Sequence, residues 1–233
     1  MNENIIEIKG LKKKFPGVQA LKGINLEIPA GMITGIVGPN GSGKSTMLKI
    51  ISGLIVKDSG QIKINRKNNS QHLMQDIAFL PEINHLYKWM TIAEMIKFHE
   101  EQYSDFSAVK AETLLKFMNL KLEQKINNLS KGMVARLKLV LVLSRSAEVV
   151  ILDEPLAGID PASRERILET LIGEFDSENQ TIILATHEII EAERFLDHVI
   201  FIENGELLLS ANADDLRAEK GKSIRELIGE VFE

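Results

Sequence analysis

Gly38-Pro39-Asn40-Gly41-Ser42-Gly43-Lys44-Ser45-Thr46 fits the phosphate-binding pattern G-x-x-x-x-G-K-[ST] at every fixed position. The residues before this loop, Met32–Val37, are apolar and β-branched and predict a buried strand, and those after it, Met47–Ile51, predict a helix. A strand, a glycine-rich loop and a helix in this order are the context that the pattern requires. We therefore predict that the loop binds the phosphates of a nucleotide; the alternative is a glycine-rich turn with an incidental lysine.

The residue types of this loop suit a phosphate ligand. Glycines let the backbone curl until successive N–H groups point at one phosphate, and the following helix adds its unpaired N–H groups and the positive end of its dipole. Lys44 is expected to place an ammonium on the β- and γ-phosphates, and the Ser45 hydroxyl is expected to bind Mg²⁺. The predicted phosphate ligands are Gly38, Asn40, Gly41, Ser42, Gly43, Lys44, Ser45 and Thr46.

The composition narrows the class of protein. A chain of 233 residues can bury a large core and form one α/β domain with an inserted subdomain. Its 28 basic and 33 acidic residues give a net charge of −5, so we expect no nucleic-acid partner. The chain has no cysteine, which suits a reducing compartment. It lacks a signal-peptide pattern and any apolar run long enough to span a membrane, so we expect a soluble, intracellular protein.

Two kinds of hydrophobic pattern alternate along the chain. Short β-branched segments predict strands over residues 5–9, 24–28, 61–65, 76–80, 149–152, 181–185, 198–202 and 206–209. Helical periodicity replaces this pattern between Thr91 and Ser146, where three helices indicate an inserted helical subdomain. Further helices are expected over residues 161–175, 189–196 and 216–219 and after Ser223. Asn204-Gly205 predicts a hairpin, and Asn65–Gln71 a polar loop.

Asp153 and Glu154 directly follow the continuous apolar run Val149–Leu152, which is typical of a parallel strand covered on both faces. A carboxylate at the carboxyl end of such a strand faces the crevice in which ligands bind. Asp153 is therefore expected to hold Mg²⁺, and Glu154 to orient or deprotonate a water molecule for attack on the γ-phosphorus. The alternative is a pair of helix-capping residues.

Five further segments, with the loop and the carboxylate pair, make this sequence resemble an ATP-binding cassette (ABC) ATPase over nearly its whole length. Leu129-Ser130-Lys131-Gly132-Met133 resembles the family signature L-S-G-G-Q, and Ala157-Gly158-Ile159-Asp160 resembles the S-G-L-D loop. His187 stands at the position of the family's switch histidine, and Phe15 at that of the aromatic residue that stacks on adenine. Leu80-Pro81-Glu82 occupies the segment called the Q-loop.

The resemblance implies a fold and a division of the chain. The expected fold class is α/β, a P-loop NTPase core sheet with an N-terminal antiparallel β region and an inserted helical subdomain. Residues 1–90 and 147–211 would form the ATPase core, and residues 91–146 the helical subdomain that carries the signature. Residues 212–233 would form a C-terminal helical tail.

The resemblance also implies roles for residues outside the loop. Ser130 and Gly132 would contact the γ-phosphate of ATP bound by a second ABC ATPase subunit, so that two ATP molecules are buried in a head-to-tail dimer. Asp160 would face the same subunit, Glu82 would contact Mg²⁺ or water, and His187 would contact the γ-phosphate. The residues alone also fit other roles, namely helix caps (Ser130, Asp160), a core aromatic residue (Phe15) and a structural histidine (His187).

The sequence departs from the family pattern at three positions. Lys131 and Met133 replace the glycine and glutamine of the signature, and Glu82 replaces the glutamine of the Q-loop, which makes a neutral contact to Mg²⁺ anionic. The S-K-G-M signature and the Pro-Glu pair resemble ATPases of bacterial exporters for antibiotics and peptides. The same departures leave open a degenerate or regulatory ABC partner in a heterodimer. A P-loop kinase or GTPase fits less well, because a kinase would need a site for a phosphoryl acceptor and a GTPase the guanine-reading Asn-Lys-x-Asp pattern, and the sequence shows neither.

The function that the resemblance implies is ATP hydrolysis that drives transport, with export favoured, through separate membrane permease subunits. The protein would then be cytoplasmic and held at the inner face of the cell membrane by those subunits. Tyr87, Trp89 and Met90 either line the groove for a permease helix or pack the helical subdomain onto the sheet. The predicted catalytic residues are Lys44, Glu154 and His187, and the predicted Mg²⁺ ligands are Ser45, Asp153 and Glu82.

Overall fold

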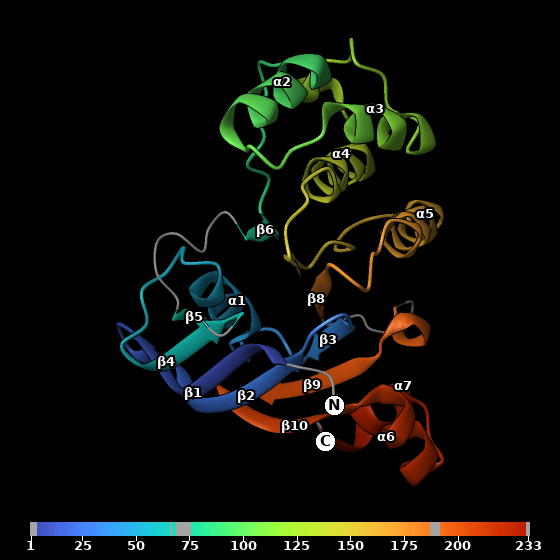
Figure 1. Cartoon of the computed structure of the whole chain (residues 1–233). Coiled ribbons are helices and arrows are strands. Elements are labelled where there is room, and N and C mark those ends of the chain that lie inside the picture. The colour runs from blue at the N-terminus through green and yellow to red at the C-terminus, as the bar shows by residue number, and fades with distance from the viewer. Residues whose placement is uncertain (1–3, 66, 69–75, 187–191, 232–233) are drawn as a thin grey trace. The chain divides into compact units, whose positions relative to one another are not determined.

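The computed structural model describes residues 4–65, 67–68, 76–186 and 192–231 of the chain. The chain separates into two compact units, of which the first comprises residues 1–74 and 176–233 and the second residues 75–175. Both units contain strands and helices (Figure 1), which confirms the predicted α/β class. The finer division into core, helical subdomain and tail stays a prediction.

The N-terminal part of the first unit is an antiparallel sheet, as predicted. Its strands are β1 (Asn4–Phe15), β2 (Val18–Pro29), β4 (Ser59–Ile64) and β5 (Lys67–Asn68), in the order β2-β1-β4-β5. The hairpin of β1 and β2 turns at Pro16 and Gly17, where φ of Gly17 is +79°. Pairing extends to Phe15 and Val18, so both strands are longer than their apolar patterns predict. β5 lies within the segment predicted as a polar loop.

A second sheet of the same unit carries the predicted phosphate-binding loop. Its strands are β3 (Ile33–Val37), β8 (Thr181–Thr186), β9 (His198–Glu203) and β10 (Glu206–Asn212), in the order β10-β9-β3-β8. β3 is buried along its whole length and runs parallel to both β8 and β9. Its carboxyl end leads through the loop into α1 (Lys44–Ile51). The predicted hairpin between β9 and β10 turns at Asn204 and Gly205, both with positive φ.

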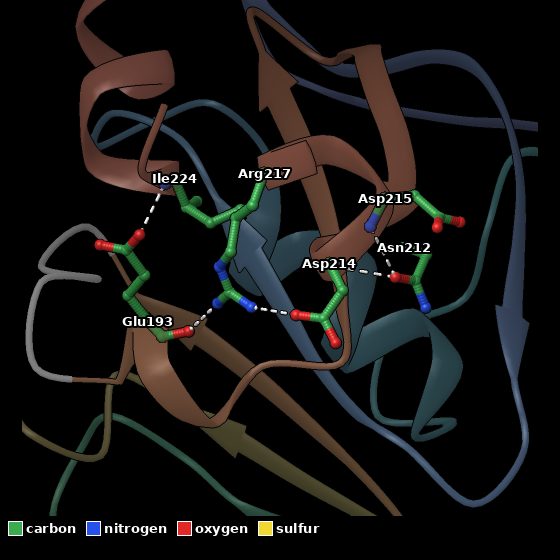
Figure 2. A network of polar contacts seen from close by, with 6 residues as sticks. All are labelled: Glu193, Asn212, Asp214, Asp215, Arg217 and Ile224. Atoms are coloured by element: carbon green, nitrogen blue, oxygen red, sulfur yellow. Dashed lines mark hydrogen bonds and ion pairs between the residues drawn. The ribbon is translucent and has the colours of Figure 1, made fainter. Parts of the chain in front are cut away.

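The C-terminal helices α6 (Ala213–Lys220) and α7 (Ile224–Val231) are held to the short 3₁₀ helix η3 (Glu193–Phe195) by a polar network (Figure 2). The Arg217 guanidinium donates to the Glu193 carbonyl at 2.6 Å and to the Asp214 carboxylate at 2.7 Å. The backbone N–H of Ile224 donates to the Glu193 carboxylate at 2.6 Å. The helix predicted over residues 189–196 is therefore a 3₁₀ helix in its described part, and residues 187–191 lie outside the described residues.

The second unit pairs β6 (Ile77–Leu80) and β7 (Val149–Asp153) in parallel and adds a set of helices. These are α2 (Ile92–Gln102), α3 (Ala108–Phe117), the 3₁₀ helix η2 (Ile126–Asn128), α4 (Lys131–Leu143) and α5 (Pro161–Gly173). Local sequence fixes where the helices begin, because Thr91 and Glu94 form the predicted capping box and Asp160 caps α5 ahead of a proline. α4 is buried from Leu137 to Leu143. Within the described residues, the helices are all too short or too polar to cross a membrane.

His198 gives the stability of the first unit a defined pH dependence. Burial lowers the pKa of this histidine below its ordinary value of 6.5, and its Nε2 lies 2.9 Å from Ser210 Oγ. As the pH falls, the unfolded chain binds a proton here before the folded chain does, so the folded state loses stability. We expect the melting temperature to fall between about pH 7.5 and about pH 5.5.

His198→Gln keeps a hydrogen-bonding group but cannot titrate, so it should reduce this pH dependence. Melting curves of both proteins over that range, in matched buffers, test this expectation. An equal fall of the melting temperature in both proteins would assign the pH dependence to groups other than His198.

Candidate active site

The predicted phosphate-binding loop joins the carboxyl end of β3 to the first turn of α1. Gly41 and Gly43 lie in the left-handed region of backbone conformation, with φ of 82° and 109°, and Gly43 is the N-cap of α1. Glycine takes these angles without strain, so both residues let the chain change direction within the loop. The Ser42 N–H donates to the Pro39 carbonyl at 3.1 Å and closes the turn.

Gly38 and Gly43 are also needed because neighbouring strands pass close to them. A Cβ atom at Gly38 would lie 2.0 Å from the Ile202 carbonyl oxygen of β9. One at Gly43 would lie 2.7 Å from the Ala20 carbonyl oxygen of β2. Since close-packed backbone cannot yield by that much, a side chain at either position would displace the loop. The strands around the loop thus dictate two of its three glycines.

Lys44 and Ser42 supply polar groups inside the loop. Lys44 is only 5% exposed, and its Nζ donates to the carbonyl oxygens of Gly38 at 2.7 Å and Pro39 at 3.1 Å. Ser42 Oγ is buried and has no hydrogen-bond partner among the residues that the structure describes. Buried hydroxyls are almost always hydrogen-bonded in folded proteins, so this atom fits a ligand with acceptor oxygens.

The remaining predicted ligands of the loop lie at its surface and at the start of α1. Asn40 and Gly41 are exposed at the tip of the loop. Ser45 and Thr46 are half-buried in the first turn of α1, where helix N–H groups lack carbonyl partners within the helix. The loop therefore combines a buried ammonium, a buried hydroxyl and a helix N-terminus, which together suit the phosphates of a nucleotide.

Phe15 ends β1 in the same unit and is 38% exposed. Lys13 Nζ lies 5.3 Å from the centre of its ring and also pairs with Asp58 at 2.9 Å. The ring is therefore not a core residue, which removes the structural alternative raised by the sequence. An exposed aromatic ring of this kind can stack on a nucleotide base.

The carboxylate pair lies in the second unit, at the carboxyl end of β7. Asp153 is the last residue of that strand and is fully buried. Glu154 is half-buried and has a positive φ of 49°, which is rare for residues other than glycine and asparagine. Such a backbone costs of order 1–3 kcal/mol and is concentrated at functional sites. Glu154 is thus held in a strained turn rather than in a helix cap.

The signature segment begins α4. Ser130 is exposed and is the N-cap of this helix, where its Oγ accepts a hydrogen bond from the Met133 N–H at 3.3 Å. Gly132 lies beside the N-terminus of α5, since a Cβ atom on it would be 3.4 Å from Asp160 Oδ2. Asp160 is exposed and caps α5 by accepting from the Ser163 N–H at 3.0 Å, which lowers the pKa of its carboxyl group. The two motifs thus meet within the second unit.

A cavity of about 520 Å³ in the second unit brings several of these residues together. Its charged lining residues are Glu82, Lys88, Lys131, Lys138 and Glu154. Of the predicted site residues, Glu82 of the Q-loop and Glu154 of the carboxylate pair therefore share one cavity, together with Lys131 of the signature segment.

Lys138 is the member of this lining that sequence analysis missed. It lies in α4, is 7% exposed, and has a pKa lowered to about 8 by burial, which the charges of Asp153 and Glu82 oppose. A single lysine in an apolar helix carries no signal that it points to a site. Its partners are carbonyl oxygens of the segment after β6, and these cannot be inferred from sequence spacing.

Comparison with known proteins gives the family. The family model described as ABC transporter matches residues 21–157. The ABC transporter ATP-binding protein YtrB of Bacillus subtilis is 31% identical over 92% of this chain and 74% of its own length. The lantibiotic transport ATP-binding protein SrtF of Streptococcus pyogenes is 31% identical over 90% of this chain and 92% of its own length.

A solved structure agrees with this result. The dimeric ATP-binding cassette MJ0796, in a post-hydrolysis state bound to ADP and Pi, superimposes with a TM-score of 0.78. It is 26% identical and covers 89% of this chain and 98% of its own. The chain belongs to the ABC transporter family. It is an ABC ATPase, an ATP-binding subunit of a transporter.

The predicted site residues fall into three groups. The loop residues lie together in the first unit, with Phe15 at the end of β1 in that unit. Glu82, Asp153, Glu154, Ser130, Gly132 and Asp160 all lie in the second unit. His187 lies outside the described residues. The positive φ of Glu154 and the contact between Gly132 and Asp160 had no signal in the sequence.

Proposed function

We propose that this ABC ATPase binds MgATP at the phosphate loop and hydrolyses it with Glu154 as general base. The observation that carries the proposal is the interior of the loop, where a buried ammonium and a buried hydroxyl lie in the same turn, the hydroxyl without a hydrogen-bond partner among the described residues. Lys44 would exchange its two carbonyl partners for the β- and γ-phosphates. Phe15 would stack on the adenine, and the N–H groups from Gly38 to Thr46 would surround the phosphates.

The carboxylates would complete the reaction centre. Ser45, Asp153 and Glu82 offer the oxygen ligands that Mg²⁺ prefers, and the bound ion would supply positive charge to the leaving phosphate. Glu154 would accept a proton from the attacking water molecule, and its strained backbone favours one fixed direction of the carboxylate. His187 would contact the γ-phosphate, as its position after β8 in the sequence implies.

Pairing with a second ABC ATPase subunit would complete each site. Ser130 is exposed at the N-terminus of α4 and therefore available to a phosphate bound by another chain. The contact between Gly132 and Asp160 supports a common dimer surface for the signature and Asp160. The relative MJ0796 forms a dimer with nucleotide. Two ATP molecules between two such chains would close the dimer, and their hydrolysis would open it.

The membrane partner would be a permease, and the direction of transport export. Tyr87 and Trp89 are 46% and 71% exposed, with ring centres 5.9 Å apart, whereas Met90 is buried. The two exposed rings suit a helix presented by another protein. In this proposal Tyr87 and Trp89 would line the permease groove, and the buried Met90 would pack inside the unit. The S-K-G-M signature and the name of the relative SrtF support export of an antibiotic or peptide. The chain would then lie at the cytoplasmic face of the membrane.

Concentration dependence of ATP hydrolysis tests this proposal. If two identical chains form the sites, the rate per chain should rise with protein concentration, because only paired chains complete the sites. GTP should compete poorly, since no guanine-reading motif occurs in the sequence. A rate per chain that is constant with concentration would contradict pairing. No hydrolysis by the purified chain alone would favour the degenerate partner of a heterodimer.

A further inference from the structure

Lys138 connects α4 to the chain that follows β6. Its Nζ donates to the carbonyl oxygens of Pro81, of Glu82 at 3.0 Å and of Ile83 at 3.2 Å. A lysine ammonium has three N–H donors, so three converging carbonyls satisfy it completely. β6 ends at Leu80, and these carbonyl oxygens therefore lie beyond its hydrogen-bonded ladder. Lys138 thus supplies to these carbonyl oxygens the hydrogen-bond donors that a neighbouring strand would supply within a sheet.

The burial of Lys138 makes these bonds strong. Lys138 is 7% exposed as a whole residue, so its side chain loses much of its hydration, and such a loss is tolerated only when donors are matched by acceptors. Hydrogen bonds from a charged donor contribute more than neutral ones, particularly where water is excluded. The segment after β6 is consequently fixed to the helix rather than free to move past it.

The position of Lys138 along α4 links the segment after β6 to the N-terminus of that helix. α4 is a regular helix from Lys131 to Leu143, and Lys138 lies eight residues, or about 12 Å, from its N-cap Ser130. A helix of this length moves as a rigid body. A displacement of Ser130 along with α4 must therefore carry the backbone of Glu82 with it or break the bonds to Lys138.

We propose that Lys138 is a positioning residue that ties the backbone of Pro81–Ile83 to α4, so that Glu82 and Ser130 move together. The proposal rests on the proposed function, in which Glu82 serves the chain's own MgATP and Ser130 that of a second subunit. Lys138 thereby couples the two ATP sites of a dimer. Its ammonium points at backbone carbonyl oxygens rather than at a reacting group, so it acts through Glu82 and is not itself a catalytic residue.

The test compares Lys138→Met with Arg145→Met as the matched control. Both changes remove a buried cation that bonds to backbone carbonyl oxygen, and the bonds of Arg145 include those to Ile77 O, at the start of β6, and to the Asp105 carboxylate. Hydrogen exchange over residues 77–90 and steady-state ATPase kinetics are measured for each. Lys138→Arg serves as the conservative variant, because it keeps the charge and donors.

Lys138→Met should speed exchange of the Leu86 amide, whose N–H donates to Asn84 Oδ1 at 3.1 Å, about tenfold, whereas Arg145→Met should leave that amide unchanged. It should lower kcat about ten- to a hundredfold, because a reacting group displaced by about 1 Å costs that much. KM for ATP should stay within about twofold, since Lys44 and the loop are untouched. Lys138→Arg should restore part of kcat and of the exchange protection.

Unchanged exchange in Lys138→Met would overturn the proposal, as would a loss of kcat no larger than that of Arg145→Met. If Lys138→Met fails to fold, Lys138→Arg decides, since it only partly replaces the bonds to residues 81–83: faster exchange of the Leu86 amide than in the unaltered chain supports the proposal, and unchanged exchange overturns it. If the unaltered chain does not hydrolyse ATP, the proposed function fails. The exchange result then still decides whether Lys138 holds the segment.

Discussion

Glu154→Gln is expected to abolish steady ATP hydrolysis while leaving ATP binding intact. Glutamine has nearly the same shape as glutamate but cannot accept a proton from water, so the rate should fall about 10²- to 10⁴-fold. The backbone strain at this position, with φ of 49°, is common to both residues, so the turn should keep its geometry. Phosphate release by the purified variant at saturating ATP measures the loss.

The same variant should accumulate as a dimer with ATP, since the step that opens the dimer no longer occurs. Sedimentation or size-exclusion chromatography should show the dimer with ATP and the monomer with ADP. Glu165→Gln is the matched control, because Glu165 is an exposed carboxylate on α5 in the same unit; its rate and its sedimentation should equal those of the unaltered chain. Normal turnover by Glu154→Gln would remove Glu154 from its assigned role.

Lys44→Met is expected to weaken ATP binding by about ten- to a hundredfold. The ammonium is the one formal charge that the loop itself contributes, and hydrogen bonds to charged groups are each worth up to about 3 kcal/mol. Methionine keeps the length and apolar stem of the side chain, so the packing of α1 should survive. Titration with a fluorescent ATP analogue measures the affinity.

Stability must be measured alongside, because Lys44 Nζ also donates to the Gly38 and Pro39 carbonyls. A small fall in melting temperature is expected from the loss of these two bonds. Lys49→Met is the matched control, since Lys49 lies in the last turn of the same helix, away from the loop, and it should bind ATP normally. Unchanged affinity in Lys44→Met would place the phosphates elsewhere.

Local sequence determined most of the elements. The phosphate loop, the capping box at Thr91 and Glu94, and the proline after Asp160 each act within a few residues of chain, so their effect can be read from the sequence. The hairpin at Asn204-Gly205 has the same cause, since asparagine and glycine accept the positive φ that a tight turn needs. These signals, with the motif order, were sufficient for the α/β fold and the family.

The ends of the strands and the type of the short helix η3 could not be predicted from the sequence. β1 and β2 extend beyond their apolar pattern because paired strands continue as long as backbone partners are present. The described part of the predicted helix over residues 189–196 is instead the 3₁₀ helix η3, which is held by Arg217 and Ile224 from the C-terminal helices. A contact with residues more than twenty positions away leaves no local signal.

The sequence by itself determined which residues are the candidates for phosphate chemistry, because loop, glycines, lysine and carboxylates lie in short motifs whose geometry is local. The tertiary structure alone decided how those motifs are held. It places Ile202 and Ala20 against the loop glycines, sets Gly132 beside Asp160, and turns Lys138 onto the carbonyls after β6. Each of these contacts joins segments distant in the chain, and only the packing of the folded backbone brings such segments together.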